Sequence, residues 1–499
     1  MDWLQKQALE KGHKVFLNGL TFQEVSGRVE DIAGRLQATV GPMKRVAIWS
    51  HNSVEMALVL LALLRLQKEV LFLNVHLTVE EVLNQTQDLA IDLLLLSPEM
   101  QDKWAAYDDV KEKQRLVDAS LKAMAVAGLE RLLGKSPVDI PSLAEPADDQ
   151  IAVIMNTSAT TGKFKSVPLR WGQIRAHVEA SAQTLGAQDK DNWLMVLPLF
   201  HVSGFSILMR SLYNGTAVTI HEKYDEPKAL EALQSGSITM VSLVPTILKS
   251  LAPKLAGPDG LRCILLGGEY IPEALVDLAL EKGLPIYKTY GMTETFSQCV
   301  TFSVLDHLDK RASVGRPLPG MQVTIANPDA EGVGEIHVSG PMLMSGYLGR
   351  EPIEGAFNTD DMGYMDPDGF LYILNRRKDL IISGGENIYP KEIEDCLYGL
   401  PFIKECAVVP AEDPKWGQVP ALFMAVDQSA WQAYTGNGLQ LILDETGLDA
   451  HRNEDLIKAY VEAYLKDHLA SYKVPKYSRI LPALPRNGTG KIVRKDLVL

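Results

Sequence analysis

Short runs of apolar residues recur through the first half of the chain, separated by segments with a helical spacing of apolar and polar positions. The runs lie at 45–50, 69–75, 92–97, 193–198, 217–221, 239–245 and 262–268. Continuous apolar runs of strand length are typical of parallel strands that helices cover on both faces. The first part of the chain is therefore predicted to be a large α/β domain of layered parallel sheets.

Two further stretches of the first half give weaker patterns. The longest apolar run, 57–64, is too short to span a bilayer, so we interpret it as a buried helix and expect no integral membrane segment. Residues 101–150 are charged and weakly patterned. They predict a surface helix and a linker before a new strand at Ile151.

The pattern changes from about residue 310, where short strand-like runs alternate with Gly/Pro turns. This texture predicts a small β-rich subdomain. A final α+β unit is predicted from two helices and three strands, at 391–400, 405–411, 420–426, 455–469 and 478–484. We place the boundary near Lys378, which gives an N-terminal domain of residues 1–377 and a small, mobile C-terminal domain of residues 378–499.

Composition and charge narrow the class of protein. A chain of 499 residues suggests two or more domains, and a net charge of −14 argues against general binding of nucleic acid. The four cysteines have no metal-ligand spacing and are too few for a disulfide framework, which favours free thiols in a reducing cytoplasm. Residues 1–30 mix acids and bases throughout, so no secretory signal is expected.

The segment TSATTGKFKSV (157–167) combines hydroxyls, a glycine and lysines directly after an apolar run. Side chains of these types suit a polyphosphate. The segment does not match the Walker pattern, because no glycine stands five residues before Gly162 and Phe164 replaces the magnesium-binding Ser or Thr. The alternative is a Ser/Thr-rich surface turn. The candidate phosphate-binding residues are Thr157, Ser158, Thr160, Thr161, Gly162, Lys163 and Lys165.

Three other motifs follow predicted strands. His201 is expected at the end of a strand before a glycine-containing turn, where it could orient a substrate or be an ordinary half-buried histidine. Gly267 and Gly268 end an apolar run, where a flat ligand could approach the backbone. In YGMTET (290–295), Glu294 is a hard oxygen ligand suited to Mg²⁺, and Thr293 offers a hydroxyl to a phosphate.

The last third of the chain adds a hairpin and two glycine-rich turns. Asp361 and Arg376 are predicted to lie on adjacent strands of a hairpin, and a carboxylate there could accept from ribose hydroxyls. The stretch RRKDLIISGGENIYPKEIE (376–394) places two glycines, a carboxylate and an amide in one turn. Lys491 lies in a second glycine-rich turn, where it could enter an active site or simply be solvated.

Taken together and in this order, the motifs resemble the adenylate-forming superfamily of acyl- and aryl-CoA ligases, nonribosomal-peptide adenylation domains and insect luciferases. The resemblance covers nearly the whole chain. Within the superfamily, PLFHVSGFS, RCILLGG, YGMTETFSQ, RRKDLIISGGENIYP, WGQVP and YKVPK look most like the o-succinylbenzoate–CoA ligases of bacterial menaquinone synthesis. This implies that ATP and a carboxylate give an acyl-adenylate and pyrophosphate, and that CoA then displaces AMP after the small domain rotates.

The resemblance also implies roles for individual residues. The 157–165 segment would hold phosphates, Thr293 the α-phosphate and Glu294 the Mg²⁺ ion. Lys378 occupies the hinge position, and Lys491 would be the adenylation lysine. Adenine would lie against Gly267, Gly268, Glu269, Tyr290 and Gly291, while Asp361 and Arg376 would contact ribose and phosphate. The thioester-forming face would contain Gly384, Gly385, Glu386 and Asn387.

For the acyl substrate, the expected pocket comes from two segments. The family activates the succinyl carboxylate and leaves the benzoate free, so the benzoate needs a hydrogen-bond donor. Candidates for that donor are Arg210, Ser206, Ser297 and Gln298, in a pocket shared with His201, Ser203, Gly204, Gly291 and Phe296. The partners expected are therefore small molecules, and the sequence leaves open whether copies of the chain form a homo-oligomer.

Several positions depart from the family pattern. The phosphate loop usually has Gly, Pro and Gly where this chain has Ala159, Phe164 and Ser166, and TDD replaces the usual TGD at Asp360. Where a glycine is needed for a positive φ, these side chains would strain the backbone and weaken ATP binding. The alternatives are another acyl- or aryl-CoA ligase and a degraded binding protein on this scaffold. A third alternative is a P-loop NTPase, which the absence of the Walker spacing disfavours.

Overall fold

The computed structural model describes residues 3–112, 125–128, 133–140, 144–157, 164–255, 257, 260–376, 379–383, 386–435, 453–486 and 492–499. It divides into two compact units. The first comprises Met1–Tyr270, Leu278–Val323 and Val338–Phe357, and the second Ile271–Asp277, Thr324–His337 and Asn358–Leu499. The domain boundary predicted at Lys378 lies outside the described residues and stays a prediction.

The first unit contains a six-stranded sheet whose inner strands are parallel. Its order is β6 (Ala125–Gly128), β5 (Leu93–Leu96), β3 (Arg45–Trp49), β4 (Glu69–Leu73), β7 (Ile151–Thr157) and β8 (Lys165–Arg170). Only β7 and β8 pair antiparallel. The strands expected at 45–50, 69–75, 92–97 and after Ile151 are confirmed, as is the buried helix, α3 (Val54–Arg65).

The interpretation of residues 101–150 as a helix and a linker was incomplete. The expected helix is α5 (Pro98–Glu112), but Ala125–Gly128 then forms an edge strand in register with β5. Four small residues, AVAG, carry too little side chain to mark a strand in the sequence. Pairing with the neighbouring strand decides their conformation instead.

A second, nine-stranded sheet completes this unit. Its order is β15 (Arg316–Pro317), β14 (Ser297–Ser303), β13 (Ile286–Met292), β12 (Cys263–Leu266), β11 (Met240–Leu243), β9 (Asn192–Met195), β10 (Ala217–Ile220), β1 (Val15–Leu17) and β2 (Leu20–Thr21). From β13 to β1 the pairing is parallel, which confirms the strands expected at 193–198, 217–221, 239–245 and 262–268. Antiparallel strands close both edges.

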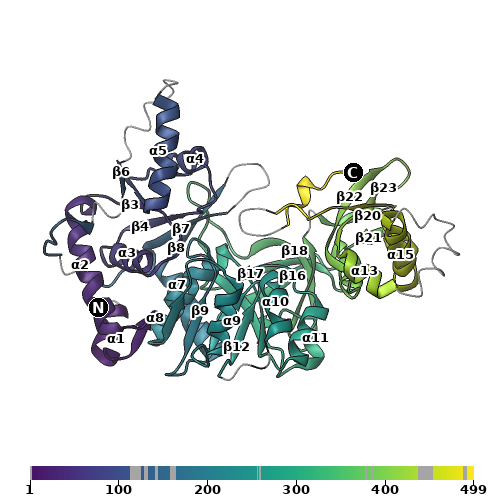
Figure 1. Cartoon of the computed structure of the whole chain (residues 1–499), viewed down its shortest axis with the longest axis horizontal. Coiled ribbons are helices and arrows are strands. Elements are labelled where there is room, and N and C mark those ends of the chain that lie inside the picture. Colours follow the sequence, from purple (N-terminus) through teal and green to yellow (C-terminus); the bar gives the residue numbers. More distant parts are fainter. Residues whose placement is uncertain are drawn as a thin grey trace. The chain divides into compact units, whose positions relative to one another are not determined.

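Helices cover the two sheets, and two of them matter for the site. Helices α7 (Trp171–Leu185) and α8 (Val202–Asn214) pack against one another and against strands of the nine-stranded sheet (Figure 1). One continuous apolar cluster joins residues of both sheets, from Leu4 to Met344. The remaining helices described along the first 281 residues are α1 (Trp3–Lys11), α2 (Phe22–Val40), α4 (Val79–Gln87), α9 (Glu226–Gln234), α10 (Pro245–Leu251) and α11 (Glu273–Glu281).

The β-rich part after residue 310 is confirmed as a four-stranded sheet. Its order is β16 (Gln322–Ala326), β17 (Gly334–Ser339), β18 (Phe357–Met365) and β19 (Leu371–Arg376). The last two strands form the predicted hairpin, in which Asp361 pairs with Arg376. The prediction that these two site candidates lie on adjacent strands is therefore confirmed, and the structure adds that they pair directly.

The second unit also contains the predicted α+β fold. Its sheet runs β21 (Glu386–Ile388), β20 (Ile381–Ser383), β23 (Gly417–Val426) and β22 (Ile403–Asp413), with β24 (Tyr477–Ile480) parallel to β23. Its helices are α12 (Pro390–Tyr398), α13 (Gln428–Thr435) and α15 (Asn453–His468). A separate apolar cluster around Trp431 and Phe402 forms its core.

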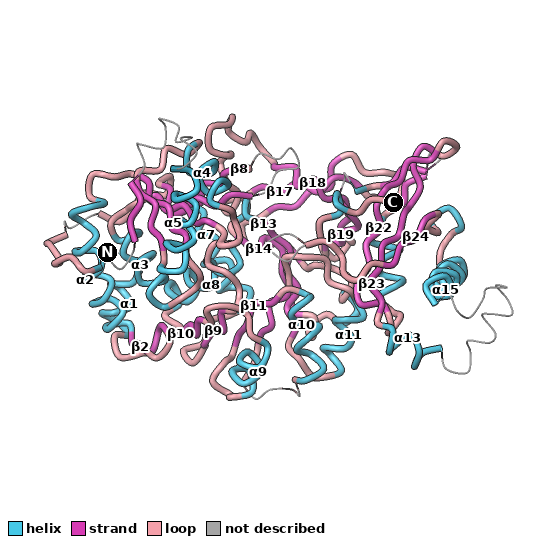
Figure 2. The backbone as a smooth tube through the Cα atoms, turned by 45° about the horizontal axis from the view of Figure 1, so that its top comes forward, coloured by secondary structure: helices cyan, strands magenta, loops and turns pink. Residues whose placement is uncertain are grey.

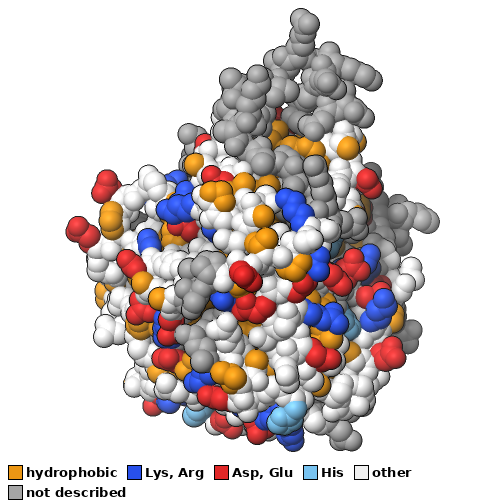
Figure 3. All heavy atoms as spheres, turned by 90° about the vertical axis from the view of Figure 1, so that its left-hand side faces the viewer, with side chains coloured by type: hydrophobic (Ala, Val, Ile, Leu, Met, Phe, Trp, Pro, Cys, Tyr) orange, Lys and Arg blue, Asp and Glu red, His pale blue; other side chains and the backbone are white. Residues whose placement is uncertain are grey.

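Two observations bear on the surface. Among the described residues, no helix is both long enough and apolar enough to cross a bilayer. On the face drawn in Figure 3, acidic and basic side chains lie interspersed.

Candidate active site

A tight hairpin joins β13 to β14 and carries the YGMTET motif; the two strands lie side by side in Figure 2. A bulge follows Tyr290, so that Gly291 faces Gln298. A Cβ atom at Gly291 would lie 1.7 Å from the carbonyl oxygen of Ser297, which only glycine avoids. Phe296 and Ser297 have φ of 53° and 96°. The fold thus holds this hairpin in a costly backbone conformation, as is common where function fixes the geometry.

Glu294, in the 3₁₀ turn Thr293–Thr295 of this hairpin, is held at both its backbone and its side chain. Its carbonyl oxygen accepts from the backbone N–H of Met344 (2.8 Å) and from Nε2 of Gln173 (3.1 Å). Its carboxylate oxygen Oε1 accepts from the hydroxyl of Tyr347 at 2.7 Å. Two segments that are distant from it in the sequence, around Gln173 and at 344–347, therefore hold Glu294 in place.

Arg210 is a fully buried cation without a carboxylate partner among the described residues. Its Nη2 donates to the hydroxyls of Ser206 (3.0 Å) and, more weakly, Ser297 (3.4 Å). Its guanidinium also lies 5.3 Å from the ring centre of Trp193. Burial lowers the pKa of Arg210 to about 9, so the group is still charged at pH 7. Burying an unpaired charge costs several kcal/mol, and an anionic ligand would offset that cost.

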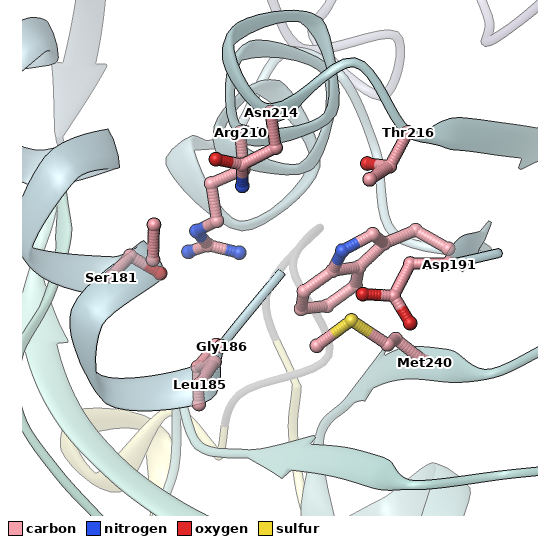
Figure 4. Close-up of a pocket in the computed structure, with 10 residues that line it drawn as sticks. Ser181, Leu185, Gly186, Asp191, Arg210, Asn214, Thr216 and Met240 are labelled. Carbon is pink, nitrogen blue, oxygen red and sulfur yellow. The ribbon is translucent and has the colours of Figure 1, made fainter. Parts of the chain in front are cut away.

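Arg210 lines a small cavity of about 10 Å³ together with Ser181 and Trp193, shown in Figure 4. The guanidinium extends from α8 toward the side formed by Ser181 of α7. Nε and Nη1 of Arg210 have no hydrogen-bond partner among the described residues. A cavity of this size holds about one water molecule, which could serve those two donors. It cannot admit a carboxylate substrate, so an anion would have to reach Arg210 from the side of Ser206 and Ser297.

The prediction for the surroundings of His201 was partly wrong. His201 does follow β9 through a short loop, but it is the N-terminal cap of α8, and Gly204 lies inside that helix rather than in a turn. The first turn packs so closely on the loop that a Cβ atom at Gly204 would lie 2.2 Å from the carbonyl oxygen of Pro198. Glycine is thus required by packing and not by turn geometry. Ser203 and Ser206 follow on the same helix.

The two glycines expected at the end of a strand are found there, whereas Tyr290 and Gly291 lie inside β13 and not after it. Gly267 and Gly268 follow β12, with φ of 85° at Gly268, and a Cβ atom at Gly267 would lie 2.6 Å from Cγ2 of Thr289. Both the oxygen and the nitrogen of the Gln298 side-chain amide already have hydrogen-bond partners. It accepts from Ser181 (3.1 Å) and donates to Thr301 (2.9 Å).

Only the edges of the phosphate loop are described. Thr157 ends β7 and pairs with Lys165, which begins β8. The departure at Ser166 is accommodated, because its hydroxyl donates to Oδ1 of Asn156 at 2.7 Å. The remaining candidates of this loop, and Ala159, lie outside the described residues: Ser158, Thr160, Thr161, Gly162 and Lys163.

In the second unit, Asp361 is buried on β18 opposite the backbone of Arg376. The positive φ expected at the TDD motif is confirmed, since Asp360 has φ of 61°, in the region that favours glycine. The effect of this residue on ATP binding stays a prediction. Glu386 and Asn387 lie in β21, although their side chains are not described. Lys378, Gly384, Gly385 and Lys491 lie outside the described residues.

The structure adds two residues that the sequence interpretation missed. His177 on α7 is fully buried, packs edge-on against Phe296 at 4.9 Å, and has no hydrogen bond to either ring nitrogen among the described residues. Tyr347 bonds Glu294 from a loop that follows β17. Neither residue belongs to a sequence motif that marks it, because each contacts a partner that is far away in the sequence.

A divalent cation at Glu294 fits the donor set. Among the described residues, no group of three or more His, Cys, Asp or Glu side chains could hold a metal by itself. Mg²⁺ commonly binds through one or two carboxylates and completes its shell with substrate phosphates and water. A single carboxylate near the end of a candidate phosphate loop meets that requirement.

Comparison with known proteins identifies the family of the chain. Residues 4–348 match the family described as AMP-binding enzyme, and residues 392–491 match the AMP-binding enzyme C-terminal domain. Among curated proteins, the chain is 50% identical over 497 residues to the 2-succinylbenzoate–CoA ligase of Lactococcus lactis subsp. lactis (strain IL1403), with 100% of each chain covered. It is 35% identical to the enzyme of that name from Bacillus velezensis, covering 99% of this chain and 97% of the relative.

Solved structures give the same picture. The o-succinylbenzoate CoA synthetase of Bacillus subtilis, in complex with the acyl-adenylate intermediate OSB-AMP, superposes with a TM-score of 0.84 at 33% identity, covering 99% of this chain and 97% of that one. The same protein in complex with ATP and magnesium ion also gives a TM-score of 0.84, at 32% identity and with 99% and 98% covered.

Proposed function

Since the chain belongs to the family of AMP-binding enzymes, we propose that it is the AMP-forming ligase that converts o-succinylbenzoate (2-succinylbenzoate) to o-succinylbenzoyl-CoA. The reaction consumes ATP and CoA, releases AMP and pyrophosphate, and serves menaquinone biosynthesis. It is supported by the name shared by relatives of 35% to 50% identity that align along the whole chain.

The observation that carries the choice of acid is the buried Arg210, which has no carboxylate partner among the residues that the structure describes. An enzyme for a simple monocarboxylic acid would not need a buried cation beside the part of the acid that does not react. O-succinylbenzoate has two carboxylates, of which only the succinyl one reacts. The Nη2 atom and the two serine hydroxyls within 3.4 Å of it form a donor set for the other, the benzoate.

The first half-reaction joins the succinyl carboxylate to the α-phosphate of ATP and releases pyrophosphate. The Mg²⁺ held by Glu294 would offset charge on the phosphates. In our proposal Thr293 binds the α-phosphate, Lys491 approaches the reacting oxygens, and Gly267, Gly268 and Tyr290 receive the adenine. Asp361 accepts from the ribose hydroxyls. His201, at the start of α8, orients the acyl group beside the helix that carries Arg210.

The second half-reaction breaks the acyl–phosphate bond of the adenylate. The sulfur of CoA forms the thioester, AMP leaves, and the thiol proton passes to solvent. We propose that residues 378–499 rotate about Lys378 between the two steps, so that Lys491 is replaced by the segment from Gly384 to Asn387. The supply of ATP and CoA suggests the cytoplasm, and a homo-oligomer stays a prediction.

A pair of substrates that differ in one group tests the assignment. 4-Oxo-4-phenylbutanoate is o-succinylbenzoate without the ring carboxylate. We expect the wild-type protein to use the dicarboxylic acid with a kcat/KM about a hundredfold higher, because a buried charge left unpaired costs about 2–3 kcal/mol. The Arg210→Ala variant should lose most of that preference, through KM for the acid and not through KM for ATP.

Ser211→Ala is a suitable control, because Ser211 neighbours Arg210 on α8 and is equally buried. Its preference between the two acids should match that of the wild type. Equal use of the two acids by the wild-type protein would contradict the assignment and favour another acyl- or aryl-CoA ligase. An unchanged preference in Arg210→Ala would place the benzoate elsewhere.

A further inference from the structure

Tyr347 connects two parts of the nucleotide site that are far apart in the sequence. Its hydroxyl donates to Oε1 of Glu294 at 2.7 Å. Its ring lies 5.1 Å from Nζ of Lys165, at the end of the phosphate loop. The guanidinium of Arg350 is also near the ring, at 5.6 Å. One side chain thus contacts the proposed metal carboxylate and a proposed phosphate-binding lysine.

The backbone around Tyr347 is fixed by the same two regions. The N–H of Leu348 donates to the carbonyl oxygen of Ser166 at 3.0 Å, and the N–H of Met344 donates to that of Glu294 at 2.8 Å. Gly346 adopts φ of 140°, and a Cβ atom there would lie 3.1 Å from the carbonyl oxygen of Glu351. Residues 344–348 are therefore hydrogen-bonded to the site at both ends.

From these contacts we infer that Tyr347 is a positioning residue for the metal-binding carboxylate. The inference rests on the proposed function, in which Glu294 holds the cation. A carboxylate has two oxygens, and Tyr347 occupies Oε1. Among the described residues no hydrogen bond reaches Oε2, which leaves that oxygen for the ion. Partners of this kind fix the orientation of a metal ligand, and their loss typically weakens metal affinity 10- to 100-fold.

A merely structural role for the hydroxyl makes a different prediction. In that case its loss would lower stability and leave the metal's effect on ATP binding unchanged. The two roles separate in a binding experiment without the acid substrate, so that no turnover occurs. The quantity measured is the Kd of ATP by titration calorimetry, first in EDTA and then in saturating MgCl₂. The Kd in EDTA divided by the Kd in MgCl₂ gives the factor by which the bound metal strengthens ATP binding.

Tyr347→Phe keeps the ring and removes only the hydroxyl. We expect it to reduce the Kd ratio about tenfold while the Kd in EDTA stays at the wild-type value. Tyr347→Leu also removes the ring beside Lys165, so it should raise the Kd in EDTA as well. The matched control is Tyr224→Phe, which removes a hydroxyl bonded to Ser250 at 2.8 Å and should change neither constant.

A double-mutant cycle shows whether Tyr347 acts through Glu294. Glu294→Gln should lose most of the ratio, and adding Tyr347→Phe to it should have no further effect. The inference is overturned if Tyr347→Phe binds ATP like the wild type in both media, or if it lowers the ratio equally in the Glu294→Gln background. A wild-type protein whose ATP affinity ignores Mg²⁺ would overturn both this inference and the metal role in the proposed function.

Discussion

At the scale of single residues, the neighbouring ionisable side chains of Arg210 and His177 are both buried but differ in charge state. Arg210 keeps its charge, whereas burial and the nearby Arg210 hold the pKa of His177 well below its usual range. His177 is therefore a neutral ring packed against Phe296. A neutral neighbour leaves the positive charge of Arg210 available for a ligand anion instead of adding a second, repelling cation.

The neutral state of His177 predicts an acid limit to stability. Below about pH 6.5 the unfolded chain binds a proton at this histidine and the folded chain does not. The free energy of unfolding is therefore unaffected by protonation of His177 above pH 6.5. Below that pH it falls by about 1.4 kcal/mol per pH unit. Urea unfolding at pH 7.5, 6.5 and 5.5 measures it.

His177→Leu should flatten this dependence, while His76→Leu, at an exposed histidine, should keep the wild-type slope. Identical pH profiles for the wild type and His177→Leu would show that His177 takes up its proton in the folded state, and that two neighbouring cations are buried in acid.

At the scale of elements, an ion pair in the second unit joins the 3₁₀ turn Arg494–Asp496 to α12. Glu394 on α12 is buried and receives two hydrogen bonds from Arg494, at 2.6 and 2.9 Å. Arg494 also donates to the carbonyl oxygen of Val408 at 2.7 Å. Burial by itself lowers the pKa of Arg494, but Glu394 raises it above the ordinary value. Because Arg494 follows Lys491 by three positions, this pair anchors the chain beside the proposed adenylation lysine.

Arg494→Met should therefore destabilise the second unit by about 3 kcal/mol, since it leaves the buried Glu394 carboxylate with the N–H of Val408 but without its cationic partner. Hydrogen exchange at the amides of α12 and β22 reports the loss directly. Lys495→Met removes an exposed charge from the next position and should leave the exchange rates unchanged. Equal exchange in the two variants would mean that the pair contributes nothing net.

Most elements could be predicted from the sequence, because their signals are local. Continuous apolar runs marked the parallel strands, and the hairpin of Asp361 and Arg376 followed from its flanking turns. The helical position of Gly204 was missed, because it depends on contact with Pro198. The roles of Tyr347 and His177 could not be predicted either, since the side chains that they contact come from distant segments. The same holds for the surroundings of Arg210. Motif order identified the family, but only the fold shows that Arg210 is buried without a carboxylate partner among the described residues.

At the scale of the whole molecule, the proposed reaction draws on both compact units. Glu294, His201 and Arg210 belong to the first unit, while Asp361 and Lys491 belong to the second. The two family matches, at residues 4–348 and 392–491, together cover most of the chain. The central claim is thus that one chain performs both half-reactions, adenylation and thioester formation, on the same acid.

The most direct test of that claim follows the products by mass. Purified protein is incubated with Mg·ATP, o-succinylbenzoate and CoA, and separately with preformed o-succinylbenzoyl-adenylate and CoA. The wild type should give AMP, pyrophosphate and o-succinylbenzoyl-CoA in the first mixture. Lys491→Ala should lose that activity yet still form the thioester from the preformed adenylate. Pyrophosphate without thioester, or no turnover by a protein that binds ATP, would contradict the account.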